Sequence, residues 1–431
     1  MREHVVPQDG RRPKSGTILR FTVLILCIFF TPSSLTAMAK AEEPRLQSET
    51  AILIDGTTGD ILYEKNAHQQ MYPASITKIV TGIVAIEQGD TEEIVTVSEN
   101  ARNVIGTRVY LEEGEQVPLL KLIQGLLMAS GNDAGTAIAE HFDHTEEAFS
   151  QRMNAFVRET VGVKDTHFTN PHGLFDDNHY TTAYDMAMMT QYAMENEVFR
   201  EVVGTNSMEW VGEAWETTIY NHNRLIRQYD GATGVKNGYV RRSGHTLVGA
   251  AKREDTELIA VTLGAPSADA VYKDMTQLLD YGFKHYKTLH MEQGKVYRVE
   301  DRVYRVPHDT AITVDRVANY RMEVNANGLL SVKTVEGETL AHVLLQDEQS
   351  YVQNNFYSAM MGHRSPLTFS QDEVAEAVVA SVSMTNSNDS DGPSSRSNRG
   401  MYTVIGGLII VSGLVFLYLR RRRQRKRRLF Y

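Results

Sequence analysis

The stretch Pro73-Ala74-Ser75-Ile76-Thr77-Lys78-Ile79 places a serine and a lysine three residues apart. Apolar residues recur at helical spacing from this point and Gly89 provides a stop, so we predict a helix over Ser75–Gln88. Residues i and i+3 share one face of a helix, which lets the lysine amine reach the serine hydroxyl. A desolvated lysine can take the hydroxyl proton, and the positive end of the helix dipole favours the resulting alkoxide. The pattern therefore indicates nucleophilic chemistry at Ser75, with Lys78 as the base.

Two further motifs accompany this pair in the chain. Ser130-Gly131-Asn132 follows an apolar helix that we predict over Leu119–Met128, and Lys236-Asn237-Gly238 lies on an edge strand that we predict over Thr233–Tyr239. A Ser-x-x-Lys element, a Ser-x-Asn element and a Lys-Thr-Gly element together are the signature of penicillin-binding proteins and related β-lactamases. The order and the structural context of the three motifs both match that signature.

Longer strings around these motifs resemble the low-molecular-mass penicillin-binding proteins, the D-alanyl-D-alanine carboxypeptidases. The resemblance covers the chain from about Ala51 to Leu367, because that family also carries a β-rich C-terminal domain. The matching strings are Pro73–Ile79, Leu126–Ala134, Asn170–Leu174, Thr181–Asp185 and Gly234–Tyr239.

The resemblance implies a reaction and a role for each motif residue. Ser75 would attack the carbonyl between the two terminal D-alanines of a peptidoglycan stem pentapeptide, and Lys78 would accept its proton. Ser130 would relay protons. The residues expected to bind the substrate are Asn132, Lys236, Asn237, Gly238 and Tyr239, with the backbone N–H groups of Ser75 and Tyr239 as the oxyanion hole. β-Lactams are the expected inhibitors, and neither a metal nor another cofactor is implied.

The chain departs from the family pattern in two places. Asn237 stands where the family usually has a threonine whose hydroxyl contacts the substrate carboxylate, and no arginine occurs between Gly264 and Met275, where some members carry one. Two alternatives therefore stay open beside the carboxypeptidase: a DD-endopeptidase, and a cell-wall-binding relative that turns over poorly. A Ser–Lys mechanism needs no histidine, so we assign His172 and His179 to structural roles.

The order of the predicted elements indicates an α+β fold with an antiparallel sheet. A hairpin is predicted from Ala51–Asp55 and Asp60–Glu64, and strands are predicted at Thr246–Ala251 and Leu258–Leu263. With the resemblance, this gives a penicillin-binding-protein-like catalytic domain over residues 45–290. Short alternating stretches then predict a small β-rich domain over residues 296–367.

The N-terminus has the pattern of a signal peptide over residues 1–39. Basic residues precede a ten-residue apolar run, Phe21–Phe30, and Ala37-Met38-Ala39 supplies a small-x-small cleavage signature. The single cysteine, Cys27, lies inside that run, so an intramolecular disulfide and a cysteine metal site are excluded.

The C-terminus has the pattern of a membrane anchor. A linker rich in Ser, Asn and Asp over residues 381–400 precedes an uncharged run of 19 residues, Met401–Leu419, which has the length of a transmembrane helix. The basic tail, residues 420–431, is expected to stay in the cytoplasm. The sequence thus predicts a single-pass protein of the cell membrane, with its catalytic domain on the extracytoplasmic face and the lipid bilayer as a partner.

The charge of the chain is concentrated at its ends. Residues 1–20 contribute +3 and residues 420–431 contribute +8 to a formal net charge of −10, so the remainder carries −21. An acidic body repels phosphates instead of releasing their counterions, which argues against nucleic acid as a partner.

Overall fold

The computed structural model describes residues 43–361. From Pro44 on, the described residues belong to one compact unit. Within residues 43–361, no helix is both long and apolar enough to cross a bilayer. The predicted signal peptide, linker, membrane helix and basic tail lie outside the described residues.

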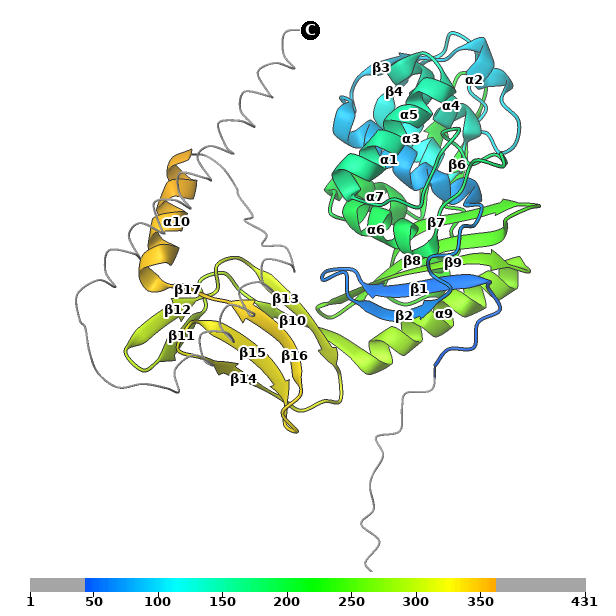
Figure 1. Cartoon of the computed structure of the whole chain (residues 1–431). Coiled ribbons are helices and arrows are strands. Elements are labelled where there is room, and N and C mark those ends of the chain that lie inside the picture. The colour runs from blue at the N-terminus through cyan, green and yellow to red at the C-terminus, as the bar shows by residue number, and fades with distance from the viewer. Residues whose placement is uncertain (1–42, 362–431) are drawn as a thin grey trace, which may run out of the picture. The chain divides into compact units, whose positions relative to one another are not determined.

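The sheet that positions the site has five antiparallel strands in the order β2-β1-β9-β8-β7 (Figure 1). The predicted hairpin and the two later strands are confirmed, and the predicted edge strand lies at the end of the sheet. The bounds are β1 Thr50–Asp55, β2 Ile61–Lys65, β7 Ala232–Val240, β8 Gly244–Arg253 and β9 Thr256–Ala265.

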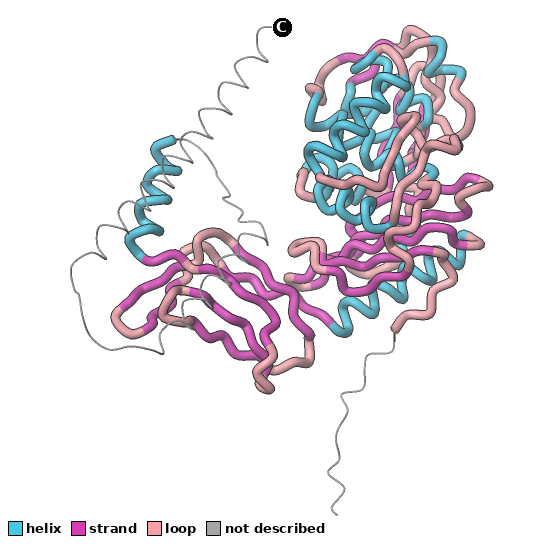
Figure 2. Tube along the Cα trace, in the orientation of Figure 1, coloured by secondary structure: helices cyan, strands magenta, loops and turns pink. Residues whose placement is uncertain are grey.

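Both faces of this sheet are buried. In β1, Ala51 and Leu53 pack with the helix α9 (Ala268–His285), whereas Ile52 and Ile54 pack with the helices on the opposite face. Figures 1 and 2 show the long helix α9 along one side of the sheet and a cluster of helices on the other. Because both faces contact helices, β8 and β9 are nearly continuous apolar runs instead of alternating polar and apolar residues.

The helical cluster carries most of the predicted motifs. The predicted helix at Ser75–Gln88 is a 3₁₀ turn, η1 (Ala74–Thr77), that continues into α1 (Lys78–Gln88), and the helix predicted at Leu119–Met128 is α3 with those bounds. The other helical elements are α2 Glu99–Asn103, α4 Asn132–Asp143, α5 Glu146–Phe156, the π-helical turn η2 Val157–Val161, α6 Ala183–Met194, α7 Glu197–Gly204 and α8 Leu225–Gln228. Two small antiparallel sheets of two strands each complete this part: β3 Ile94–Thr96 with β4 Gln116–Pro118, and β5 Ser207–Val211 with β6 Glu216–Tyr220.

Short strands follow α9, as the alternating pattern predicted. They form three small antiparallel sheets, β10-β13, β11-β12-β17 and β14-β15-β16, around a core that includes Val306, Leu330 and Val332. The strands are β10 Tyr286–Met291, β11 Val296–Val299, β12 Arg302–Arg305, β13 Thr310–Asp315, β14 Tyr320–Val324, β15 Leu329–Thr334, β16 Thr339–Leu344 and β17 Gln346–Asp347, followed by the helix α10 Glu348–Met361.

Candidate active site

Ser75 and Lys78 lie where η1 passes into α1. The Lys78 Nζ atom lies 3.3 Å from Ser75 Oγ, and it also donates to Asn132 Oδ1 at 2.7 Å and to the His172 carbonyl at 2.6 Å. The Lys78 side chain has no exposed surface. Burial lowers the pKa of Lys78 well below its ordinary value, and the nearby Lys236 lowers it further, while Asp133 raises it. The amine is thus biased toward the neutral form that can accept a proton from the Ser75 hydroxyl.

The second motif joins α3 to α4 beside this amine. Ser130 is buried and has a positive φ of 62°, so the chain turns sharply between the two helices. Asn132 begins α4, and its side chain contacts two elements: Oδ1 accepts from Lys78, while Nδ2 donates to the Ile105 carbonyl at 2.7 Å. Asn132 therefore fixes both the lysine amine and the loop that contains Ile105.

The third motif lies on the edge strand β7. Lys236 is 1% exposed, its Nζ donates to the Asn237 carbonyl at 3.0 Å, and burial lowers its pKa to about 7. Gly238 lies against the start of η1, because a Cβ atom there would be 2.8 Å from the Ser75 backbone nitrogen. Tyr239 is the next residue, so the Ser75 and Tyr239 backbone nitrogens belong to neighbouring segments. In the described part of the chain, Asn237 Oδ1 is buried and has no hydrogen-bond partner.

A loop that contains Asn170–Leu174 contacts Lys78 and the first turns of the helix around it. The His172 carbonyl accepts from Lys78, and the Pro171 carbonyl accepts from Thr81 Oγ1 at 2.6 Å. Gly173 has a φ of +83°, and a Cβ atom there would lie 1.9 Å from the Ala74 carbonyl oxygen. Only glycine allows the loop to approach η1 this closely.

The two histidines of this region are neutral and hydrogen-bonded. His179 Nδ1 accepts from the Thr169 N–H at 3.1 Å, so its Nε2–H donates to Thr77 Oγ1 at 2.8 Å, and burial lowers the pKa of His179 to about 3. His172 Nδ1 accepts from the Leu174 N–H, which leaves Nε2–H to donate to Glu146 Oε1 at 3.2 Å. Burial also lowers the pKa of His172. Both rings hold the backbone near Ser75 and Lys78 and neither reaches the Ser75 hydroxyl.

The structure brings all three predicted motifs together and adds residues that the sequence analysis missed. Asp133 has no exposed surface and accepts from the Val109 and Leu111 N–H groups, which holds the loop beside Asn132 in place. Glu146 orients the His172 ring. The position of Asp133, directly after Asn132, could have singled it out, but nothing near Glu146 in the sequence relates it to Lys78.

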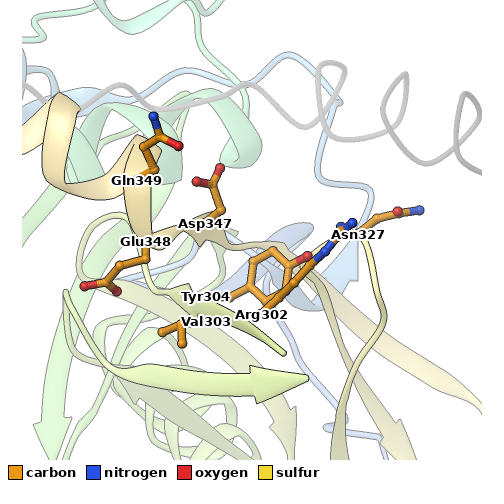
Figure 3. Close-up of a pocket in the computed structure, with 7 residues that line it drawn as sticks. All are labelled: Arg302, Val303, Tyr304, Asn327, Asp347, Glu348 and Gln349. Carbon is orange, nitrogen blue, oxygen red and sulfur yellow. The ribbon is translucent and has the colours of Figure 1, made fainter. Parts of the chain in front are cut away.

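A separate hollow of about 550 Å³ lies among the later strands (Figure 3). Arg302 and Tyr304 line it, and both donate to the Ala326 carbonyl. Their polar groups are thus used to hold the turn between β14 and β15, and none of the three motifs contributes to the hollow. Across residues 43–361, no cluster of His, Cys, Asp and Glu has the arrangement of a metal site.

The fold and the site formed by the three motifs define a serine peptidase with the architecture of the penicillin-binding proteins. Residues 37–267 match the protein family described as D-alanyl-D-alanine carboxypeptidase, peptidase S11. The chain belongs to this family, so the resemblance noted in the sequence is confirmed.

Individual relatives agree with this assignment. The D-alanyl-D-alanine carboxypeptidase DacF of Bacillus subtilis is 35% identical over 331 residues, which cover 74% of this chain and 81% of the relative. DacA of Haemophilus influenzae is 32% identical over 283 residues, or 61% of this chain and 68% of the relative. The structure of penicillin binding protein 5 from Haemophilus influenzae matches with a TM-score of 0.62 at 28% identity, covering 71% of this chain and 97% of that one. DacD from Francisella tularensis, at 24% identity and a TM-score of 0.61, has the same fold over 74% of this chain and all of its own.

The close approach of Gly173 to η1 gives a test of the site's construction. We expect Gly162→Ala, at a φ of +91° with open space around it, to lower the free energy of unfolding by about 1–2 kcal/mol for the left-handed backbone alone. Gly173→Ala has a similar φ and the contact with Ala74 as well, so a further loss of about 1–3 kcal/mol is expected. Urea unfolding followed by the fluorescence of Trp210 and Trp215 measures both variants. Equal losses would show that the approach to η1 is not tight.

Proposed function

We propose that the chain is a serine-type D-alanyl-D-alanine carboxypeptidase that removes the terminal D-alanine from peptidoglycan stem pentapeptides. The observation that carries this proposal is the fully buried Lys78 amine 3.3 Å from Ser75 Oγ. Membership of the D-alanyl-D-alanine carboxypeptidase family supports the reaction type and the substrate class.

The acylation step follows from the contacts of Lys78. Neutral Lys78 accepts the proton of the Ser75 hydroxyl, Ser75 Oγ bonds to the carbonyl carbon of the fourth residue, and the electrons of that carbonyl move onto its oxygen. The backbone N–H groups of Ser75 and Tyr239 stabilise this oxyanion. The C–N bond to the terminal D-alanine then breaks, and the proton returns through Lys78 and Ser130 to the leaving amine. Water hydrolyses the resulting ester and regenerates Ser75.

The edge strand supplies the groups that recognise the C-terminal carboxylate. The Lys236 ammonium is buried, and within residues 43–361 its Nζ atom donates to a single backbone carbonyl, so it retains donors for an anion. The Asn237 amide can donate where the family has a threonine hydroxyl. β-Lactams carry a carboxylate and a strained amide and are therefore expected to acylate Ser75 as inhibitors.

The location and the domain division are parts of the same proposal. The signal-peptide pattern of residues 1–39 and the anchor pattern of Met401–Leu419 support an exported enzyme tethered to the cell membrane by its C-terminus. The pairing of β10 with β13 favours a boundary near Tyr286 between the catalytic domain and the β-rich domain.

Release of D-alanine from a stem pentapeptide tests the proposed reaction. We expect Ser75→Ala to lower this release by at least about a thousandfold, because the nucleophile is removed. Ser207→Ala on β5 is the matched control and should leave the rate unchanged. If a fluorescent penicillin acylates the wild type but no D-alanine is released, the result would favour the alternative of a cell-wall-binding relative that turns over poorly. Asn237 is the residue that suggests this alternative. Faster cleavage of a cross-linked dimer than of the pentapeptide would favour the endopeptidase.

The two buried lysines predict a bell-shaped dependence of kcat/KM on pH. Lys78 must be neutral, so activity rises as pH increases through its lowered pKa. Lys236 must be charged to bind the carboxylate, so activity falls as pH increases through about 7 in the free enzyme. Lys236→Arg keeps the charge at high pH and should remove the alkaline limb. An unchanged alkaline limb in that variant would assign it to another group.

A further inference from the structure

The order of residues along β7 gives the cleft a direction. Lys236 comes first, Gly238 lies beside the Ser75 nitrogen, and the strand then ends in the turn to β8, which contains Arg242. If the substrate carboxylate lies at Lys236, as the proposed function requires, the scissile carbonyl lies at Ser75. The rest of the stem peptide then extends past Tyr239 toward the turn.

The turn that contains Arg242 contacts a pair of aromatic rings. The Arg242 guanidinium lies 5.9 Å from the ring centroid of Phe175, and the Phe175 ring lies edge-on to Tyr72 at 5.0 Å. Phe175 follows the Asn170–Leu174 loop that contacts Lys78, and Tyr72 precedes Ser75 by three residues. Both segments are therefore held close to the nucleophile, yet 42% of the Phe175 side chain is exposed. An aromatic ring kept at the surface beside an active site is available to contact substrate.

Charges of both signs flank this ring. Arg242 is exposed and has no carboxylate partner among the described residues, and the adjacent Arg241 is exposed as well. Asp176 and Asp177 directly follow Phe175, are exposed, and have no cationic partner within residues 43–361. The surface thus combines an apolar ring, a guanidinium without a carboxylate partner and two exposed carboxylates, of which Asp176 Oδ1 accepts from the Asn178 N–H at 2.7 Å.

We propose that Phe175, Arg242 and the Asp176–Asp177 pair form the subsite for the third residue of the stem peptide and select a zwitterionic side chain. The side chain that fits is a hydrocarbon chain ending in a carbon that carries both an ammonium and a carboxylate. Its methylenes pack on Phe175, its carboxylate pairs with Arg242, and its ammonium pairs with Asp176 or Asp177.

The spacing and the charges both favour this occupant. An extended peptide advances about 3.3 Å per residue, so the third residue lies one step beyond the acylated D-alanine, and a long side chain covers the remaining distance to Arg242. A lysine side chain at that position would place its ammonium near the Arg242 guanidinium, and it has no carboxylate to offset the repulsion between the two cations. A neutral hydrocarbon side chain would leave the Arg242 guanidinium and the aspartate carboxylates without partners of opposite charge on the substrate.

Four synthetic pentapeptides test the subsite. Their third residues are 2,6-diaminopimelate, its side-chain carboxamide, lysine and norleucine, and D-alanine release is measured with the full-length wild type, Arg242→Gln and Arg241→Gln. We expect the wild type and Arg241→Gln to prefer the carboxylate over the carboxamide by about five-fold in kcat/KM. Arg242→Gln should lose that preference and cleave the norleucine peptide at the wild-type rate. An equal preference in Arg242→Gln and in the wild type would overturn the proposal.

Binding to the Ser75→Ala variant separates this inference from the proposed function. Calorimetry with the same four peptides should give a dissociation constant about five-fold lower for the carboxylate than for the carboxamide. The difference should vanish when Arg242→Gln is added. D-Alanine release from all four peptides at one rate would leave the function intact and refute the subsite. No release from any peptide would refute the function, and the binding ratios would then decide the subsite alone.

Discussion

The site depends on one amine that is held out of water beside a serine hydroxyl. An ammonium group without exposed surface is costly, so the protein must either neutralise Lys78 or surround it with acceptors. It does both: Asn132 Oδ1 and the His172 carbonyl accept from Nζ, while burial and the second lysine, Lys236, lower the pKa. With these two hydrogen bonds made, the third close polar contact of the Lys78 amine is Ser75 Oγ. Burial of the lysine therefore favours its neutral form, which can act as a base next to the nucleophile.

The rest of the fold can be understood as the support for this arrangement. The five-stranded sheet is packed on both faces, which makes its edge strand β7 a rigid wall for Lys236 and Gly238. The junction between α3 and α4 places Asn132 in contact with the Lys78 amine, and the loop with Gly173 places the His172 carbonyl there. Glu146 and Asp133 contact no reacting atom in the proposed mechanism, yet they hold the His172 ring and the loop beside Asn132. Rigid support of this kind is what keeps catalytic groups within hydrogen-bond distance of one another.

Much of this could be predicted from the sequence, because the chemistry is concentrated in short motifs and the helices and strands have clear periodicity. The helix Leu119–Met128, the edge strand and the three motifs were all evident in the residues. The contacts that join distant segments were not. No local pattern relates Glu146 to His172, or Arg242 to Phe175, since those pairs meet only through the tertiary fold. The burial of Lys236 was also hidden, because an isolated lysine on an edge strand is equally consistent with exposure.

The most direct test of this account is the pKa of the Lys78 amine itself. NMR of the protein carrying ¹³C-labelled lysine would follow the Cε shift of Lys78 against pH, with the resonance assigned by its loss in Lys78→Arg. We predict that the pKa of Lys78 lies well below the ordinary lysine value of 10.5 and rises toward that value in Lys236→Gln, where the second charge is absent. A pKa at or above the ordinary value would mean that Lys78 is a charged structural residue, and Ser75 would then need a different base.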